Sequence, residues 1–262
     1  MSPPVLLAVD GPVARITLNR PEKLNATDLA QCHGLEAAVE AVAARPEVRV
    51  VVLGGAGRSF CSGIDRDMLA AEGMPGDYFA SHERAFHGLE RLDAFVIAAL
   101  HGHVLGGGLQ AALACDLRLC SSDAELGLPA ARDGLIPGLA TFRLPRLIGL
   151  GPARRLIFSG ESVAADEALR LGLVDQVLPA SGFAAAVDGV VAGYATAPAA
   201  ALIGATRLTA RAFDASLDTV HAELLPLLAA CLASADVAAA GAAWRQRSAA
   251  SAGPGDPGRG EG

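Results

Sequence analysis

Two glycine-rich segments of the sequence carry backbone N–H groups that could stabilise a negative charge. They are residues 54–65, GGAGRSFCSGID, and residues 101–110, HGHVLGGGLQ. Each follows an apolar run that predicts a buried strand, and glycine suits places where the backbone must approach another group closely. Three glycines at the start of a helix leave outward N–H groups with the helix dipole behind them, an arrangement able to hold an oxyanion. Either segment alone is also typical of a tight packing turn between a strand and a helix.

The elements that must position these segments follow from the apolar pattern and the turn residues. Strands are predicted over residues 5–9, 13–18, 48–53, 95–100, 117–120 and 174–178, and helices over residues 79–92, 109–114 and 164–171. A further helix, capped by Thr27 or Asp28, is expected to run to about residue 44. Residues 65–78 are expected to be a mobile stretch. The repeated order of strand, glycine turn and helix predicts an α/β fold of β-β-α units that wind forward through crossover helices.

The last quarter of the chain differs in composition from the rest. From residue 182 to about residue 247 the sequence is Ala-rich and almost wholly helical in pattern. We therefore expect a core over residues 1–197, a helical region over residues 198–250, and a boundary near Ala197 and Pro198. Residues 251–262 are rich in glycine, proline and charge, and are predicted to be a disordered tail.

Composition narrows the classes of function. The 262 residues are 52% hydrophobic, which is enough for one sizeable core, and the formal net charge of -7 with no long basic run argues against nucleic-acid binding. Five irregularly spaced cysteines with no CxxC pair indicate reduced thiols and a cytoplasmic protein. Residues 1–10 do not read as a signal peptide, and polar residues interrupt the most apolar region, which argues against a membrane span. No metal-binding cluster and no nucleotide P-loop is present in the sequence, so no metal and no separate cofactor is expected.

Taken together, the two glycine segments resemble the enoyl-CoA hydratase/isomerase (crotonase) superfamily. Residues 19–26, NRPEKLNA, look like the opening signature of that family, and residues 134–138, GLIPG, and 164–174 follow in family order. The resemblance extends from about residue 5 to residue 247. It implies a crotonase-like spiral of β-β-α units, with a C-terminal helical region that assembles the protein into a homotrimer or a dimer of trimers.

The resemblance also implies a substrate and a site. The substrate would be an acyl-CoA thioester, of which coenzyme A is a part, and its carbonyl oxygen would be held by the backbone N–H groups of Ile64 and Gly107. The residues implied to bind the rest of the substrate lie in the opening signature, in and after the first glycine segment, and in the following helix: Lys23, Leu24, Ser62, Gly63, Asp65, Arg66, His82 and Glu83. Lys23 and Arg66 would attract the phosphates of coenzyme A, although both also fit solvated surface charges.

The match fails at the two positions where the hydratases of the family keep a catalytic glutamate. The first position, two residues after the glycine triplet, is Gln110, and the second, which follows Pro129, is Ala130. Glutamine can hold a water by hydrogen bonds but has no proton to exchange at neutral pH, and alanine can do neither. Because each acid–base group typically supplies about 10²–10⁴-fold in rate, we predict that ordinary hydration is lost.

Other residues near these positions could supply the acid–base group. Asp133 lies three residues after Ala130 and is a candidate, although it also fits a helix cap or a surface carboxylate. Tyr78, His82, Glu83 and His87 fall where the family often lines its acyl pocket. Of these, His82 and Glu83 are the candidates, or they form the exposed face of a helix. His101 and His103 flank the glycine that precedes the oxyanion turn, and histidine is a natural base at neutral pH, although this end of the strand is usually packed.

The sequence therefore predicts an enzyme of the crotonase superfamily, a lyase or isomerase that acts on a CoA thioester through an enolate. The alternative is a non-catalytic acyl-CoA-binding paralogue that modulates a partner enzyme. A protease of related fold would need a nucleophilic serine at the start of the helix after the glycines, where the sequence has Leu109.

Overall fold

The computed structural model of the protein describes residues 2–251, which form two compact units. The first unit ends at Thr196 and the second begins at Ala197. No single helix of residues 2–251 is long and apolar enough to cross a membrane. Two pairs of helices, each interrupted by a sharp bend, reach the required length and composition only when both members are taken together.

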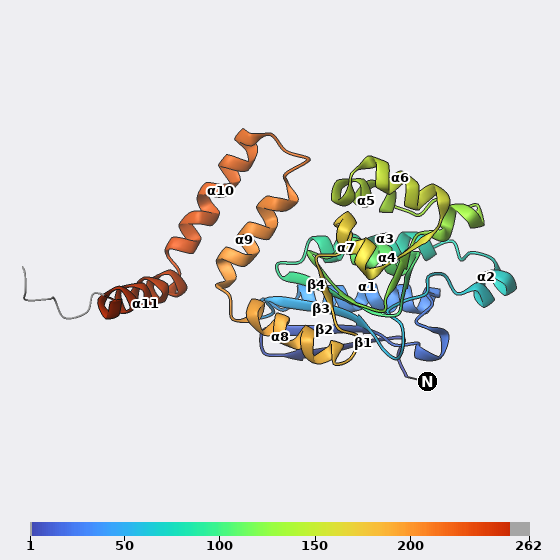
Figure 1. Ribbon diagram of the computed structural model, residues 1–262, viewed down its shortest axis with the longest axis horizontal. Coiled ribbons are helices and arrows are strands. Elements are labelled where there is room, and N and C mark those ends of the chain that lie inside the picture. The colour runs from blue at the N-terminus through green and yellow to red at the C-terminus, as the bar shows by residue number, and fades with distance from the viewer. Residues whose placement is uncertain (1, 252–262) are drawn as a thin grey trace, which may run out of the picture. The chain divides into compact units, whose positions relative to one another are not determined.

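The first unit is built on a six-stranded sheet in the order β1-β2-β3-β4-β6-β9 (Figure 1). Its strands are β1 (Val5–Asp10), β2 (Val13–Leu18), β3 (Val50–Gly55), β4 (Phe95–Leu100), β6 (Leu117–Ser121) and β9 (Gln176–Leu178). The first two strands form an antiparallel hairpin, and every later neighbour is parallel. Parallel neighbours require crossover connections, so the strand order itself agrees with the predicted forward winding of β-β-α units.

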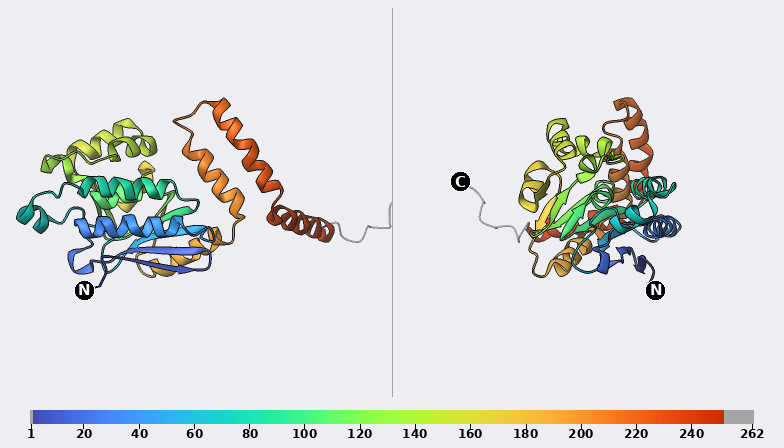
Figure 2. Two further views of the ribbon diagram at one scale, coloured as in Figure 1. Left: turned by 180° about the vertical axis from the view of Figure 1, so that it is seen from behind. Right: turned by 90° about the vertical axis from the view of Figure 1, so that its right-hand side faces the viewer.

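The sheet is buried on both faces, which explains why its central strands are continuous apolar runs. On one face, Val51 and Leu53 belong to the main core, beneath α1 (Leu29–Ala43) and α3 (Tyr78–Glu90), which pack side by side (Figure 2). On the opposite face, Val52 and its neighbours pack against α8 (Phe183–Ala195). The strict alternation between two cores fixes the register of the sheet, because a slip by one residue would exchange the two faces.

A second, three-stranded sheet lies beyond the first in the order β5-β7-β8. Its strands are β5 (His103–Leu105), β7 (Glu125–Gly127) and β8 (Ser162–Ala164). The N–H of Gly106 donates to the carbonyl of Gly127 at 2.9 Å, so this sheet fixes the turn that leads into α4 (Gly107–Leu113). The remaining helices of the first unit are α2 (Arg66–Glu72), α5 (Ala140–Ile148), α6 (Leu150–Ser159), α7 (Ala165–Leu171) and the short 3-10 helices η1 (Pro21–Lys23) and η2 (Pro129–Asp133).

The expected mobile stretch at residues 65–78 is wrong in part, because it contains the helix α2. Asp65 caps this helix, since its carboxylate accepts hydrogen bonds from the N–H groups of Asp67 at 3.0 Å and Met68 at 3.3 Å. The glycines and the proline of residues 73–76 led to the expectation of an irregular segment, and they do end the helix. An N-cap of this kind can replace the long apolar stripe that usually marks a helix in a sequence.

The second unit consists of α9 (Ala199–Ala210), α10 (Leu217–Leu232) and α11 (Ala235–Ser251). α9 and α10 pack against each other, as Figure 1 shows in orange. No residue of α10 is buried, although the helix is rich in leucine. The predicted disordered tail lies, apart from its first residue, beyond the described residues.

Candidate active site

The two glycine segments meet at a cavity of about 740 Å³. Residues from several elements form its wall: the two glycine turns, α3, η2 and residues 134–138 that follow it. The predicted site residues in the wall are Ser62, Gly63, Ile64, Arg66, His82, Glu83, Gly107, Gln110, Ala130 and Asp133. The structure therefore brings most of the predicted site to one place, although the residues come from four separate segments of the chain.

Glycine is required where the two turns touch. Gly63 has a φ of +94°, and a side chain there would place its Cβ 3.3 Å from the carbonyl oxygen of Leu105. Gly108 leaves even less room, since a Cβ would lie 2.6 Å from the Cβ of Cys61. The N–H of Cys61 also donates to His103 and its carbonyl accepts from Leu105, both at 2.9 Å. The two turns are thus held together along their backbones rather than by large side chains.

The N–H groups of Ile64 and Gly107 are free to face the cavity. Thr27 donates to the carbonyl of Gly63 at 2.7 Å and accepts from the N–H of Asp65 at 2.9 Å. In a parallel bridge of this kind the residue between those two partners, Ile64, directs its own N–H to the other side. Gly107 is the first residue of α4, so its N–H has no acceptor within the helix. Neither N–H donates to another residue of the described chain.

The two positions that lack a glutamate also face the cavity. Gln110 lies one turn into α4 and Ala130 is the second residue of η2. Gly138 packs over Gln110, because a Cβ on this glycine would lie 2.4 Å from Gln110 Oε1 and 2.6 Å from Glu83 Oε1. The wall at these two positions therefore presents an amide and a methyl group, with one carboxylate, that of Glu83, beside the amide.

The carboxylate of Glu83 is already committed to structural contacts. It accepts hydrogen bonds from the N–H of Leu139 at 2.9 Å and from Arg143 Nη1 at 3.1 Å. Arg143 is buried, and Glu90 holds its guanidinium from another side at 2.6 and 3.0 Å. Burial opposes the charged form of Arg143, but the ion pairs with Glu90 and Glu83 raise its pKa above the ordinary value. Glu83 thus fixes the start of α5 beside the cavity and is poorly placed to exchange protons.

Asp133 forms an ion pair at a distance of 3.4 Å with Arg66, between Oδ2 and Nη2. Arg66 is largely exposed and Asp133 is about half exposed, so the pair lies in the solvated part of the wall. Such a pair contributes little to stability and can open at small cost. Arg66 is consequently available to an anionic ligand, whereas Asp133 is not in the apolar part of the cavity where an acyl group would fit.

His82 occupies that apolar part. Its ring is 6% exposed, stacks on Phe86 with centroids 5.1 Å apart, and meets the ring of Tyr78 edge-on at 4.7 Å. A Cβ on Gly107 would lie 3.4 Å from His82 Cε1, so the imidazole lies next to one of the two free N–H donors. Burial lowers the pKa of His82 to about 4, which keeps the ring neutral at pH 7. The ring makes no hydrogen bond with another described residue.

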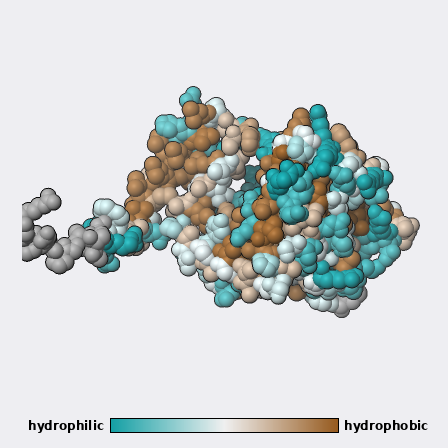
Figure 3. Space-filling model, in the orientation of Figure 1, coloured by the Kyte–Doolittle hydropathy of each residue, from teal (hydrophilic) through white to brown (hydrophobic). Residues whose placement is uncertain are grey.

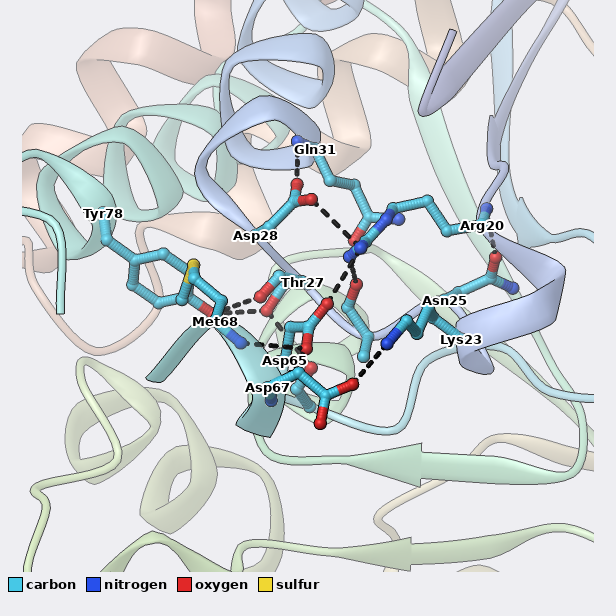
Figure 4. A network of polar contacts seen from close by, with 12 residues as sticks. Arg20, Lys23, Asn25, Thr27, Asp28, Gln31, Asp65, Asp67, Met68 and Tyr78 are labelled. Atoms are coloured by element: carbon cyan, nitrogen blue, oxygen red, sulfur yellow. Dashed lines mark hydrogen bonds and ion pairs between the residues drawn. The ribbon is translucent and has the colours of Figure 1, made fainter. Parts of the chain in front are cut away.

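Three predicted binding residues do not line the cavity. Lys23 forms an exposed ion pair with Asp67, and Leu24 accepts a hydrogen bond from the N–H of Ser62 at 3.0 Å through its carbonyl. Asp65 is buried and pairs with Arg20, with 2.8 Å between Oδ2 and Nη2 (Figure 4). These residues hold the opening signature against the first glycine turn.

Sequence reasoning missed two residues of this support. The sequence analysis gave Arg20 no role beyond its place in the opening signature, yet Arg20 forms an ion pair with Asp28 at 3.1 Å as well as with Asp65. Tyr78, expected only as part of the segment that lines the acyl pocket, also contacts the hydroxyl of Thr27 through its own hydroxyl. The signal for Arg20 was Asp28, because a carboxylate that caps a predicted helix is a natural partner for a basic side chain nearby in the sequence. The second partner, Asp65, is 45 residues away in the sequence and lies where no helix was predicted.

The histidines of the second glycine segment lie elsewhere. His101 Nε2 contacts the carbonyl oxygen of Gly57 at 3.1 Å, and His103 Nδ1 lies 3.5 Å from Glu125 Oε2. Neither residue is part of the cavity wall. His101 lies between β4 and β5 and His103 begins β5, and both rings make their contacts outside the cavity, so their position does not support a role as the acid–base group.

Parallel strands that wind forward through crossover helices, with two glycine turns meeting at one cavity, are the arrangement of a crotonase-type protein. Residues 9–243 match the family described as Enoyl-CoA hydratase/isomerase. The chain is similar to the short-chain-enoyl-CoA hydratase of Clostridium acetobutylicum, at 40% identity over 183 residues that cover 68% of this chain and 69% of that protein. It is also similar to the (E)-benzylidenesuccinyl-CoA hydratase of Thauera aromatica, at 39% identity over 185 residues, 69% and 72% of the two chains.

Among solved structures, the enoyl-CoA hydratase of Bacillus anthracis superposes with a TM-score of 0.86 at 29% identity, covering 93% of this chain and 96% of that one. The chain belongs to the enoyl-CoA hydratase/isomerase family and processes acyl-CoA. The predicted crotonase-like α/β fold is confirmed.

Proposed function

We propose that this protein binds an acyl-CoA with its thioester oxygen between the N–H groups of Ile64 and Gly107 and stabilises the enolate of the acyl group, without acting as an ordinary hydratase. The observation that carries the proposal is that two free backbone donors face one cavity whose wall has Gln110 and Ala130 in place of carboxylates.

Two fixed donors are what enolate chemistry needs. Removing the α-proton of a thioester moves charge onto the carbonyl oxygen, and N–H groups held by the surrounding backbone stabilise that charge without first having to reorient. The loss of one such donor costs about 2.7–4 kcal/mol in comparable sites. Because the N–H of Ile64 is fixed by the bridge through Thr27 and that of Gly107 by α4, both are preorganised for this role.

Hydration needs more than these donors. A water must be activated and a proton delivered to carbon, and neither Gln110 nor Ala130 can exchange a proton at neutral pH. The chemistry that remains open is that of the enolate itself, such as isomerisation, decarboxylation or carbon–carbon cleavage. The protein would then be a lyase or isomerase, with coenzyme A as part of the substrate rather than a cofactor.

The charges around the mouth of the cavity suit the nucleotide part of the substrate. Arg66 is exposed beside the cavity and Lys23 lies on the surface next to α2, so both can reach phosphate oxygens after releasing their weak surface partners. Tyr78, Phe79 and Phe86 form an aromatic wall for the acyl group. All five cysteines are free thiols, which supports a cytoplasmic location.

Infrared spectroscopy of butyryl-CoA labelled with ¹³C at the thioester carbonyl tests the proposal. On binding, the carbonyl stretch should move to lower frequency, because two hydrogen bonds weaken the C=O bond. Gly107→Pro removes one N–H at the first position of a helix, where proline is tolerated, and should reduce the shift. Gly107→Ala keeps the N–H and is the matched control.

An unshifted carbonyl in the bound wild-type complex would exclude the proposed oxyanion site, and calorimetry with free coenzyme A shows whether the nucleotide still binds. The non-catalytic alternative, which the two missing glutamates favour, shares the carbonyl shift. It differs in predicting that the bound acyl group never exchanges its α-protons with solvent.

A further inference from the structure

A second, much smaller cavity lies directly behind Gly107. Its volume is about 10 Å³, and its wall includes Thr27, Gln31, Cys61 and His82. α1, α3 and α4 enclose it, so it is separated from the acyl-sized cavity by the backbone of Gly107 and the ring of His82. A space of this size, close to one probe sphere, is about the smallest that can hold a single water.

Gln31 carries buried polar groups that have no partner. The residue is 1% exposed, and neither Nε2 nor Oε1 of its amide has a hydrogen-bond partner among the described residues. Buried side-chain amides are almost always hydrogen-bonded to protein or to ordered water. Gln31 is one of the residues that line the small cavity, so a water in that cavity is a partner that the amide could reach.

His82 connects this small cavity to the site. Its ring lines both cavities, and Cε1, which lies between the two ring nitrogens, faces Gly107. The ring has no hydrogen bond of its own with the described part of the chain, although a buried neutral imidazole offers one donor and one acceptor. A water held by Gln31 can satisfy one nitrogen and so fix which nitrogen carries the proton.

We propose that the small cavity holds one water bound by Gln31, and that this water orients His82 as the catalytic residue that removes and returns the α-proton of the bound acyl group. The inference rests on the proposed function, since it requires a thioester held at Ile64 and Gly107.

In the step itself, the lone pair of one imidazole nitrogen forms a bond to the α-proton and the Cα–H bond breaks. Its electron pair becomes the C=C bond of the enolate, and the carbonyl π pair moves to the thioester oxygen between the two N–H donors. The reverse step returns a proton to carbon. The enolate charge favours the imidazolium next to it, which offsets the effect of burial on the ring.

The other titratable groups of the site are less suited. Glu83 is bound to Leu139 and Arg143, and Asp133 pairs with Arg66 in the solvated part of the wall. The hydroxyl of Tyr78 contacts Thr27, and burial raises its pKa well above the ordinary value. Among the titratable residues of the wall, His82 alone is both next to Gly107 and without a partner within residues 2–251.

The test measures exchange of the α-protons of butyryl-CoA in D₂O by NMR, alongside calorimetric affinity for the same ligand. Wild-type protein should exchange them, and His82→Gln should lower the rate by about 10²–10⁴-fold with affinity retained. His87→Gln, an exposed position on the same helix, is the matched control and should exchange at the wild-type rate. Gln31→Met removes the amide but keeps the length of the side chain. It should lower the exchange rate by roughly tenfold, which corresponds to the free energy of one hydrogen bond.

A second readout separates positioning from packing. The ¹⁵N resonances of the His82 ring, assigned by their loss in His82→Gln, report which nitrogen is protonated, and Gln31→Met should change that pattern in a protein that remains folded. Wild-type exchange in His82→Gln with intact binding would overturn the proposal, as would an unchanged ring pattern in Gln31→Met. Absence of butyryl-CoA binding, or of its carbonyl shift, would instead refute the proposed function.

Discussion

A glutamate introduced at position 110 would have different charged neighbours from one introduced at position 130. A glutamate at position 110 would lie beside Glu83, because Gly138 packs against Oε1 of both side chains. The like charge would raise the pKa of the new carboxyl group, which suits a proton donor. A glutamate at position 130 would extend from η2 into the open cavity without a charged neighbour other than Asp133 and its partner Arg66.

These surroundings lead to a prediction for crotonyl-CoA hydration. Wild-type activity should be near background, and Gln110→Glu with Ala130→Glu should raise it, with up to ~10²–10⁴-fold available per group. The gain should be smaller if the carboxylates are misplaced, since an error of about 1 Å can cost ~10²-fold. The assay is the loss of enoyl-thioester absorbance. A wild-type turnover near ~10 s⁻¹, the median for enzymes, would contradict the prediction.

His82 should also make stability depend on pH. Its pKa is lowered from 6.5 to about 4 by burial, so the folded protein binds fewer protons at this site than the unfolded chain. The folded protein therefore keeps its full stability above pH 6.5 and loses stability as the pH falls from 6.5 toward 4. The shift corresponds to roughly 3 kcal/mol. Tyr78, which contacts the ring, and Cys61, which lines the small cavity with it, stay neutral throughout, because burial raises the pKa of both.

Urea denaturation at pH 7 and pH 5 tests this effect. Wild type should lose more stability between these values than His82→Gln, which has no group to protonate. Equal losses in the two proteins would show that the ring is not held neutral.

At the scale of elements, the first glycine turn depends on an ion pair at the start of α2. Asp65 follows the donor residue Ile64, caps α2 and pairs with Arg20 (Figure 4). Burial alone would raise the pKa of Asp65, but the hydrogen bonds from Arg20 and from the helix N–H groups lower it below its ordinary value. One carboxylate therefore links the opening signature, the turn and the helix.

Removing Arg20 should consequently be costly. In Arg20→Met, Asp65 keeps a side chain that is only 7% exposed but loses its main cation, and breaking a buried pair in this way costs about 3–5 kcal/mol. Lys23→Met removes a cation from the exposed pair with Asp67 and should change stability little. Because the pair lowers the pKa of Asp65, its stabilisation is full above pH 3.8 and disappears as the pH falls below that value.

Denaturation midpoints of both variants provide the measurement. Similar losses in Arg20→Met and Lys23→Met would mean that the buried pair does not support the turn.

The sequence predicted the six strands of the first sheet well, because buried parallel strands are continuous apolar runs. It did not predict β5, β7 and β8 of the second sheet, which are three residues long and too short to show a pattern. It also identified the family, and with it the residues that meet at the cavity, including Gln110 and Ala130. It did not predict α2, whose stability comes from the Asp65 cap. It could not choose between His82 and His101, because that choice depends on which way each backbone element turns its side chains. The position of Gln31 behind Gly107 depends on how α1 packs against α4, which no local pattern encodes.

At the scale of the whole molecule, the second unit exposes much more apolar surface than an isolated helical segment tolerates. The largest exposed apolar side chains in this unit are Phe213, Leu217, Leu225, Leu228, Leu232 and Trp244. In Figure 3 the apolar residues of this unit form a continuous brown band along one face. Exposed apolar surface of this extent is typical of a region that packs against another protein chain.

We predict that the protein is a homotrimer or a dimer of trimers in which other copies cover this surface. α10 packs against α9 but has no fully buried residue, so association with other copies would add to the hydrophobic stabilisation of this helix. Light scattering at micromolar concentration should give three or six times the monomer mass of 26.5 kDa.

Leu228→Asp with Leu232→Asp, which places two charges on the exposed face of α10, should lower the mass, whereas Asp218→Asn at the start of the same helix should not. A wild-type protein that stays monomeric would contradict the prediction, and an oligomer unaffected by the paired aspartates would place the interface outside α10.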